Sequence, residues 1–187
     1  MRVGVLAVQG AFIEHMRICQ ELGAETFEIR CAEDLVKKFD GLILPGGEST
    51  AQSLLLHQLG MFDTLRTLIE NDLPVMGTCA GMILLAQHIE NEPQAHFSTL
   101  PITVVRNGYG RQLGSFTATF DVGEVLNFKA RFIRAPYISQ VGEGVRVLAR
   151  FDGRIVAAQS GNQVAYAFHP ELGGDTRLHE NFLRKVG

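Results

Sequence analysis

Short apolar runs alternate with amphipathic stretches along the first half of the chain. Residues 2–9 have almost no polar face, which is typical of a strand in a parallel sheet that is covered on both sides. In residues 12–22 the apolar positions recur at helical spacing, and Gly23 follows as a stop signal. The same pattern predicts strands at residues 25–30, 41–44 and 75–77, a helix capped by Ser49, a helix at residues 61–71 and a helix after Gly81. This alternation predicts an α/β fold with a doubly wound, mostly parallel sheet.

The second half of the chain has a different pattern, with short strand-like pieces and no amphipathic helix until its end. Asp152-Gly153 and Ser160-Gly161-Asn162 are turn signals typical of β-hairpins. Strands are predicted at residues 99–109, 114–120, 130–134, 145–150, 154–159 and 163–168, and a final helix at residues 176–186. No linker, repeat or low-complexity tract interrupts the sequence, so we expect a single domain over residues 1–187 whose hairpin-rich second half extends the sheet.

Composition narrows the class of protein. The chain has 187 residues, of which 46% are hydrophobic and 20% charged, as in ordinary globular proteins. A net charge of −3 gives no reason to expect a nucleic-acid partner. No apolar run is long enough to span a bilayer, and residues 3–8 are too short for a signal peptide, so we expect no membrane association. Cys19, Cys31 and Cys79 cannot all pair with one another and match no zinc pattern, so we expect a reducing cytoplasm and no metal.

One cysteine has unusual neighbours. Cys79 lies in the frame Gly77-x-Cys79-x-Gly81, between an apolar run and a helical pattern. This is the thiol form of the nucleophile elbow, a sharp strand-to-helix turn that presents a reactive side chain above a sheet. The helix dipole would favour the thiolate, and the backbone N–H of Ala80 would point toward the same side as the sulfur. The motif alone is equally compatible with a buried structural cysteine at a tight turn. We expect the other two cysteines, Cys19 and Cys31, to be packing residues.

A cysteine nucleophile needs a base, and one of the six histidines is placed to supply it. His169 ends the apolar run 163–168 and is followed by Pro170 and Glu171, so the acid could orient the ring for the sulfur. The alternative is that His169 is a surface histidine before a proline turn. The nucleophile elbow in the same chain favours the catalytic interpretation over this alternative. We expect the others to be surface, helix-end or loop residues: His15, His57, His88, His96 and His179.

A third segment, residues 45–49, follows the buried strand at residues 41–44 and contains Gly46-Gly47. Two glycines allow close approach of a ligand to the backbone, and an N–H there could complete an oxyanion hole with Ala80. A plain turn is the alternative, and a phosphate loop is disfavoured because its Gly-Lys-Ser/Thr ending is absent. Three loops would therefore meet at the carboxyl edge of the sheet: Gln9-Gly10, residues 45–49 and the elbow.

Together these segments resemble a known family. The elbow at residues 77–81, the segment 168–171 and the segment 45–49 are similar to those of the triad glutamine amidotransferases. Residues 6–15, 106–112 and 132–136 are similar to the glutaminase subunits of pyridoxal 5′-phosphate synthase. The resemblance covers essentially the whole chain, and it implies a flavodoxin-like, class I glutamine amidotransferase-like fold.

The resemblance also implies an activity and a set of roles. Such an enzyme hydrolyses L-glutamine to glutamate and ammonia: Cys79 attacks the side-chain amide, His169 moves the proton and Glu171 orients His169. The oxyanion would be held by Gly47 and Ala80. The glutamine contacts of the family fall on Gly47, Glu48, Ser49, Arg106, Ile133 and Arg134. The resemblance further implies that this subunit binds no cofactor and passes ammonia to a barrel-shaped synthase subunit in a large hetero-oligomer that makes pyridoxal 5′-phosphate.

Two other classes of protein stay open on the sequence. A cysteine hydrolase or peptidase on a similar sheet would not need Gly46-Gly47-Glu48 or the two arginines Arg106 and Arg134. A non-catalytic regulatory subunit would not need an intact Cys79, His169 and Glu171.

Overall fold

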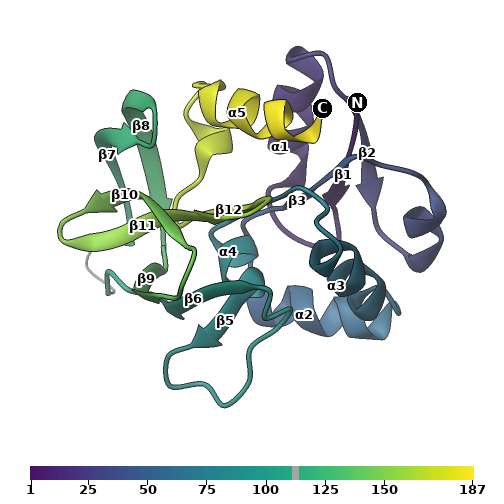
Figure 1. Cartoon of the computed structure of the whole chain (residues 1–187), viewed down its shortest axis with the longest axis horizontal. Coiled ribbons are helices and arrows are strands. Elements are labelled where there is room, and N and C mark those ends of the chain that lie inside the picture. The colour runs from purple at the N-terminus through teal and green to yellow at the C-terminus, as the bar shows by residue number, and fades with distance from the viewer. Residues whose placement is uncertain (111–113) are drawn as a thin grey trace.

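A ten-stranded mixed sheet divides the molecule, and helices cover both of its faces (Figure 1). The computed structural model describes residues 1–110 and 114–187, so residues 111 and 112 of the family-like segment 106–112 lie outside the described residues. The strands are β1 (Arg2–Leu6), β2 (Glu25–Ile29), β3 (Gly41–Leu44), β4 (Val75–Thr78), β5 (Ala86–Ile89), β6 (Leu100–Val105), β9 (Tyr137–Val141), β10 (Arg146–Phe151), β11 (Arg154–Ser160) and β12 (Gln163–Tyr166).

The sheet is parallel in its first half, as the apolar runs predict. Its order is β2-β1-β3-β4-β12-β11-β9-β6-β5, with β10 paired to β11. The neighbours from β2 to β12 all run parallel, whereas β11 pairs antiparallel with both β12 and β9. Strand β12, from late in the chain, therefore lies beside β4, and the carboxyl ends of β1, β3, β4 and β12 meet at one edge. The predicted doubly wound α/β class is confirmed.

The helices form two layers. Helices α1 (Phe12–Glu21) and α5 (Arg177–Val186) pack together on one face of the sheet, at the top of Figure 1. Helices α2 (Ser49–Gln58), α3 (Phe62–Glu70) and α4 (Ala80–Leu85) cover the opposite face. Short 3₁₀ turns, η1 (Ala32–Val36) and η2 (Pro170–Leu172), follow β2 and β12. No helix in the described ranges is long and apolar enough to cross a membrane.

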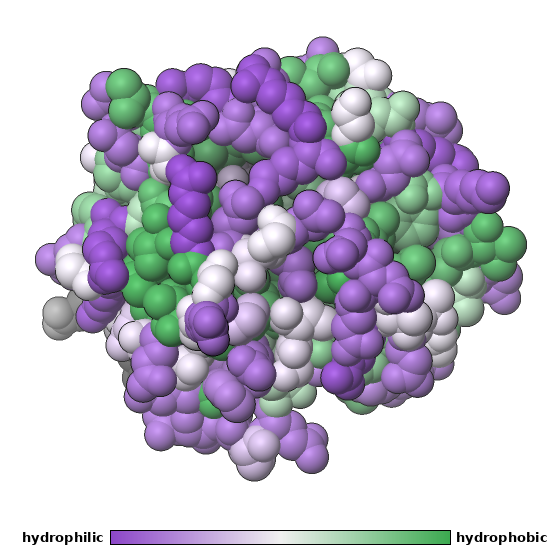
Figure 2. Space-filling view, in the orientation of Figure 1, coloured by the Kyte–Doolittle hydropathy of each residue, from purple (hydrophilic) through white to green (hydrophobic). Residues whose placement is uncertain are grey.

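A separate hairpin of β7 (Ser115–Val122) and β8 (Val125–Ile133) packs against the sheet through phenylalanines. The rings of Phe116 and Phe132 stack with centroids 4.6 Å apart, and Phe132 also contacts Phe151 and Phe168. This cluster fixes the hairpin so that the end of β8 reaches the carboxyl edge of the main sheet. On the face shown in Figure 2, polar side chains predominate, and an apolar strip lies on the left, over the strands of the second half.

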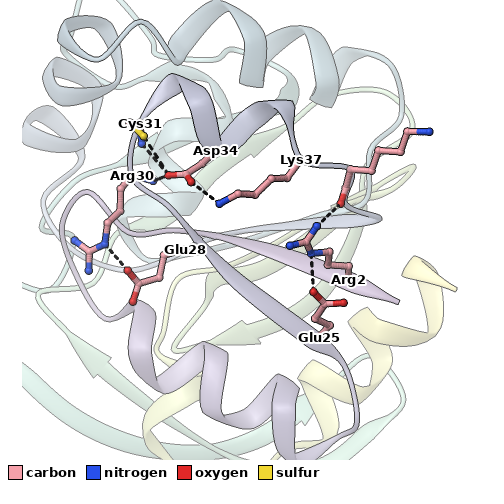
Figure 3. A network of polar contacts seen from close by, with 8 residues as sticks. Arg2, Glu25, Glu28, Arg30, Cys31, Asp34 and Lys37 are labelled. Atoms are coloured by element: carbon pink, nitrogen blue, oxygen red, sulfur yellow. Dashed lines mark hydrogen bonds and ion pairs between the residues drawn. The ribbon is translucent and has the colours of Figure 1, made fainter.

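Polar contacts hold the outer end of the parallel half, around β2 and η1 (Figure 3). Arg2 pairs with Glu25 at 2.9 Å, and Lys37 pairs with Asp34 at 2.7 Å. The second oxygen of Asp34 accepts hydrogen bonds from the backbone N–H and the thiol of Cys31. Cys31 is therefore the cap of η1, and the expectation that it ends a strand is wrong, because β2 ends at Ile29.

Several boundaries differ from the predictions for local reasons. Ser49 is not the cap of α2 but its first residue: the Glu48 carboxylate accepts the N–H groups of Thr50 and Ala51 at 3.1 and 2.8 Å. The short strands β5 and β9 were not predicted, because each is only four or five residues long and is set by pairing with β6. Strand β8 begins at Val125, ahead of the predicted residue 130.

Candidate active site

The nucleophile candidate lies on a strained turn between β4 and α4. Cys79 has φ 48° and ψ −102°, a conformation that residues with a Cβ rarely adopt. Its backbone N–H donates to the carbonyl of Tyr166 at 2.8 Å, which ties the turn to β12. Only glycine fits at position 81, because a Cβ there would lie 1.9 Å from the carbonyl oxygen of Leu44. The flanking glycine therefore lets the helix start directly above β3, and the turn has the predicted elbow geometry.

The base candidate follows the neighbouring strand. The backbone N–H of His169 donates to the Arg131 carbonyl at 2.8 Å, and its Nδ1 lies 2.6 Å from Oε1 of Glu171. Gly46 packs against the ring, since a Cβ there would lie 2.3 Å from Cε1. Burial lowers the pKa of His169, but its interactions with Cys79 and with the Glu171 carboxylate outweigh burial and raise the pKa to about 10. The structure therefore brings Cys79, His169 and Glu171 together at the carboxyl edge.

The thiol opens onto a cavity of about 300 Å³. The Cys79 sulfur lies 3.9 Å from the carbonyl oxygen of Ile133, at the end of β8. All six residues expected to contact glutamine line this cavity with the thiol: Gly47, Glu48, Ser49, Arg106, Ile133 and Arg134. Gln9, Ile83 and Asn107 also line it, and none of the three was predicted as a site residue.

A carboxylate and a guanidinium lie side by side in this cavity. Arg106 contacts Glu48 and Glu92, each at 2.9 Å, and donates to the Thr50 hydroxyl at 3.2 Å. Burial raises the pKa of Glu48, but the N–H groups of Ala51 and Thr50 and the charge of Arg106 outweigh it, so the pKa is lowered and the carboxylate stays ionised. An acid and a guanidinium at one site can read the ammonium and carboxylate groups of an amino acid.

The proposed oxyanion donors lie on two tethered loops. The Gly46 carbonyl accepts the N–H of Ala11 at 3.0 Å, and the N–H of Glu48 donates to the side chain of Gln9 at 2.8 Å. Because the Gly46–Gly47 peptide is trans, the Gly47 N–H points away from Ala11. Ala80 is the first residue of α4, directly after the thiol. The loops after β1 and β3 are thus linked by hydrogen bonds, as their common edge predicts.

The expectation that His15 and His179 are surface or helix-end residues is wrong, because both side chains are fully buried. Nδ1 of His15 lies 2.8 Å from Nε2 of His179, and Nε2 of His15 lies 3.2 Å from the Thr78 hydroxyl. The signal was present in the sequence: His15 is on the buried stripe of α1 with Ile18 and Cys19. These two histidines lie directly behind the candidate triad.

A doubly wound sheet with a cysteine at a strained elbow, and a histidine–glutamate pair at the end of the adjacent strand, is the arrangement of the triad glutamine amidotransferases. Comparison with known proteins agrees. The SNO glutamine amidotransferase family matches residues 5–187, and the chain belongs to this family.

Curated relatives and solved structures place it more closely. The chain is 57% identical over 186 residues to the pyridoxal 5′-phosphate synthase subunit PdxT of Methanocorpusculum labreanum, covering 100% of this chain and 98% of the relative. It is 54% identical to the PdxT subunit of Desulfitobacterium hafniense strain Y51, covering 100% and 94%. A crystal structure described as a glutamine amidotransferase superposes with a TM-score of 0.93 at 42% identity, covering 99% and 98%. PurLQS from Thermotoga maritima, at 16% identity and a TM-score of 0.69 over 100% and 99%, shares the fold.

Replacing Arg106 or Arg134 with methionine tests whether these arginines bind the amino-acid substrate in the cavity. We expect kcat/KM for glutamine to fall about 10- to 150-fold for each, which corresponds to roughly 1.5–3 kcal/mol for a hydrogen bond to a charged group. Steady-state glutamate release measures this. Arg66→Met is the matched control, because Arg66 is an exposed residue of α3 that pairs with Glu70. Unchanged kcat/KM in both cavity variants would show that these arginines are only structural.

Proposed function

We propose that this protein is the glutaminase subunit of a pyridoxal 5′-phosphate synthase, hydrolysing L-glutamine to L-glutamate and ammonia. The observation that carries the proposal is the single cavity that holds the elbow thiol beside the Glu48–Arg106 pair. Full-length likeness to PdxT subunits supports the same activity. The test is glutamate release from glutamine, with a peptide amide as the control substrate. Hydrolysis of the peptide in preference to glutamine would indicate a peptidase instead.

The geometry supports a two-step mechanism. The Cys79 thiolate attacks the side-chain amide carbon, a carbon–sulfur bond forms, and the N–H groups of Ala80 and Gly47 stabilise the oxyanion. His169 gives its proton to the amide nitrogen, the carbon–nitrogen bond breaks, and ammonia leaves. His169 then removes a proton from water, which attacks the thioester carbon; the carbon–sulfur bond breaks, glutamate leaves, and the Cys79 thiolate is restored beside the protonated His169. Glu171 holds the ring in one orientation throughout.

The electrostatics of His169 suit this sequence of steps. With its pKa raised to about 10, the ring holds a proton at neutral pH while it lies beside the sulfur. An imidazolium next to a thiolate is the form that can attack the amide and protonate the leaving group at once.

The ammonia has a defined destination in this proposal. A synthase subunit of barrel architecture takes it up within a large hetero-oligomer and uses it to build pyridoxal 5′-phosphate, so no cofactor is bound by the glutaminase itself. We place the protein in the cytoplasm, and the three free cysteines in the described part of the chain support a reducing compartment.

We expect the isolated chain to be a poor glutaminase that its synthase partner activates. The plane of the Gly46–Gly47 peptide can rotate at low energetic cost because both residues are glycine. Its carbonyl is linked to the 9–11 loop through the Ala11 N–H. If docking reorients this peptide, the oxyanion hole gains a donor worth about 3 kcal/mol, or ~100-fold in rate. Glutamate production is measured for the purified chain and again after the synthase is added. Equal turnover in the two samples would rule out this form of activation.

A further inference from the structure

The candidate triad leaves one oxygen of its carboxylate uncommitted. Oε1 of Glu171 is 2.6 Å from Nδ1 of His169, whereas Oε2 has no hydrogen-bond partner among the described residues. The Glu171 side chain is fully buried, so bulk solvent does not reach Oε2. A buried carboxylate oxygen without a donor is costly. The polar atom that approaches it is Nε2 of His15, at 3.4 Å.

His15 is itself held from two sides. Its Nε2 also lies 3.2 Å from the hydroxyl of Thr78, the residue before the nucleophile. Its Nδ1 lies 2.8 Å from Nε2 of His179, which α5 contributes from the same face of the sheet. Both imidazoles are completely buried between the packed helices α1 and α5. The ring of His15 therefore has one fixed position behind Glu171.

The hydrogen bonds select one tautomer. If His15 carries its proton on Nε2, that N–H donates to the Thr78 hydroxyl and lies beside Oε2 of Glu171 in an electrostatic contact at 3.4 Å rather than a hydrogen bond. Nδ1 of His15 then accepts the Nε2–H of His179. The Nδ1 atom of His179, which has no partner among the described residues, is then a bare acceptor. The opposite tautomer would turn the lone pair of His15 toward the carboxylate and leave a buried N–H on His179 without a partner. That arrangement costs more, so the first tautomer is favoured.

We propose that His15 is a positioning residue of this active site, whose neutral imidazole holds the second oxygen of Glu171 while His179 fixes its tautomer. The inference rests on the proposed glutaminase function. The resulting buried chain runs from Cys79 through His169, Glu171 and His15 to His179. Burial, then the charges of His179 and His169, keep the pKa of His15 well below its ordinary value, so His15 stays neutral when His169 is protonated. The full negative charge of Glu171 thus remains available to His169.

The test compares His15→Leu with His15→Gln, because a glutamine amide can place an N–H near the position of Nε2. We expect His15→Leu to lower kcat about 10- to 100-fold with the KM for glutamine unchanged, since His15 does not line the substrate cavity. His15→Gln should recover most of the loss. Rates are measured in the complex with the synthase and divided by the number of sites that an electrophilic glutamine analogue titrates. This division removes any loss that is due only to misfolded protein.

Two further variants complete the design. His88→Asn, at an exposed histidine of β5, is the matched control and should leave kcat unchanged. His179→Leu keeps the donor of His15 but frees its tautomer, so it should give a smaller, several-fold loss, and it serves if His15→Leu does not fold. Wild-type kcat per titrated site in both the His15→Leu and His179→Leu variants overturns the proposal. Equal losses of kcat in His15→Leu and His15→Gln also overturn it, because restoring an N–H at this position would then have no effect and the imidazole would matter only for packing. An inactive wild-type complex would instead overturn the proposed function.

Discussion

Replacing Cys79 with alanine abolishes glutamine hydrolysis, by about 10⁴-fold or more, because no other group in the cavity can form the thioester. We expect the variant to fold as the wild type does, since alanine keeps the same backbone and removes only the sulfur. Glutamate release in the complex with the synthase is the measurement. Serine at the same position is an informative companion, since it keeps the size of the side chain but not the acidity of the thiol.

Chemical labelling makes the same prediction selective. An electrophilic analogue of glutamine should modify Cys79 and spare the other two cysteines. Burial raises the pKa of the Cys19 thiol to about 12, and hydrogen bonds with Glu33 and Asp34, together with desolvation, raise that of Cys31. Both are therefore thiols at neutral pH, whereas the reagent reacts with thiolates. Peptide mass spectrometry identifies the site. Label on Cys19 or Cys31, or full activity in Cys79→Ala, would refute the assignment of the nucleophile.

The second large effect is expected at the base. His169→Asn should remove nearly all turnover, because asparagine cannot take up and return a proton between the sulfur and the leaving group. Glu171→Gln should cost less, since Glu171 orients the ring and does not transfer the proton. The amide can still accept from Nδ1–H of His169 but carries no charge to stabilise the imidazolium.

Thermal unfolding of both variants controls for folding, because His169 and Glu171 are buried. The exposed variant His88→Asn again serves as the matched control for the loss of an imidazole. Turnover in both catalytic variants that equals the wild-type rate would mean that the arrangement at the end of β12 has another role. A greater loss in Glu171→Gln than in His169→Asn would reverse the roles assigned here.

The sequence predicts the parallel half of the fold well because β1, β3 and β4 are short, mainly apolar runs with a glycine or proline close to one end. It also predicts which loops form the candidate site, since Cys79 and His169 each follow such a run. What it does not contain is the pairing of β4 with β12, which lies far along the chain and is decided by packing. That pairing is what turns two separate motifs into one candidate site.

The features that the sequence predicted wrongly, the two histidines and the cap of α2, also have physical causes. His15 and His179 are polar residues on stripes of apolar ones, and a polar side chain is more often exposed than buried. The hydrogen bond between the two rings, together with that between His15 and the Thr78 hydroxyl, offsets the cost of burying them. Glu48 replaces Ser49 as the cap of α2 because its two carboxylate oxygens satisfy two backbone N–H groups at once. Neither contact is visible from spacing alone.

The position of β12 between β4 and β11 has a consequence for biosynthesis. As the chain leaves the ribosome, β4 and the elbow emerge long before β12, so one edge of β4 remains without its partner strand. The Cys79 backbone also lacks its hydrogen bond to Tyr166 until β12 arrives. We therefore expect the nascent protein to depend on protection of this exposed edge, and its thiol to become reactive only when synthesis is nearly complete.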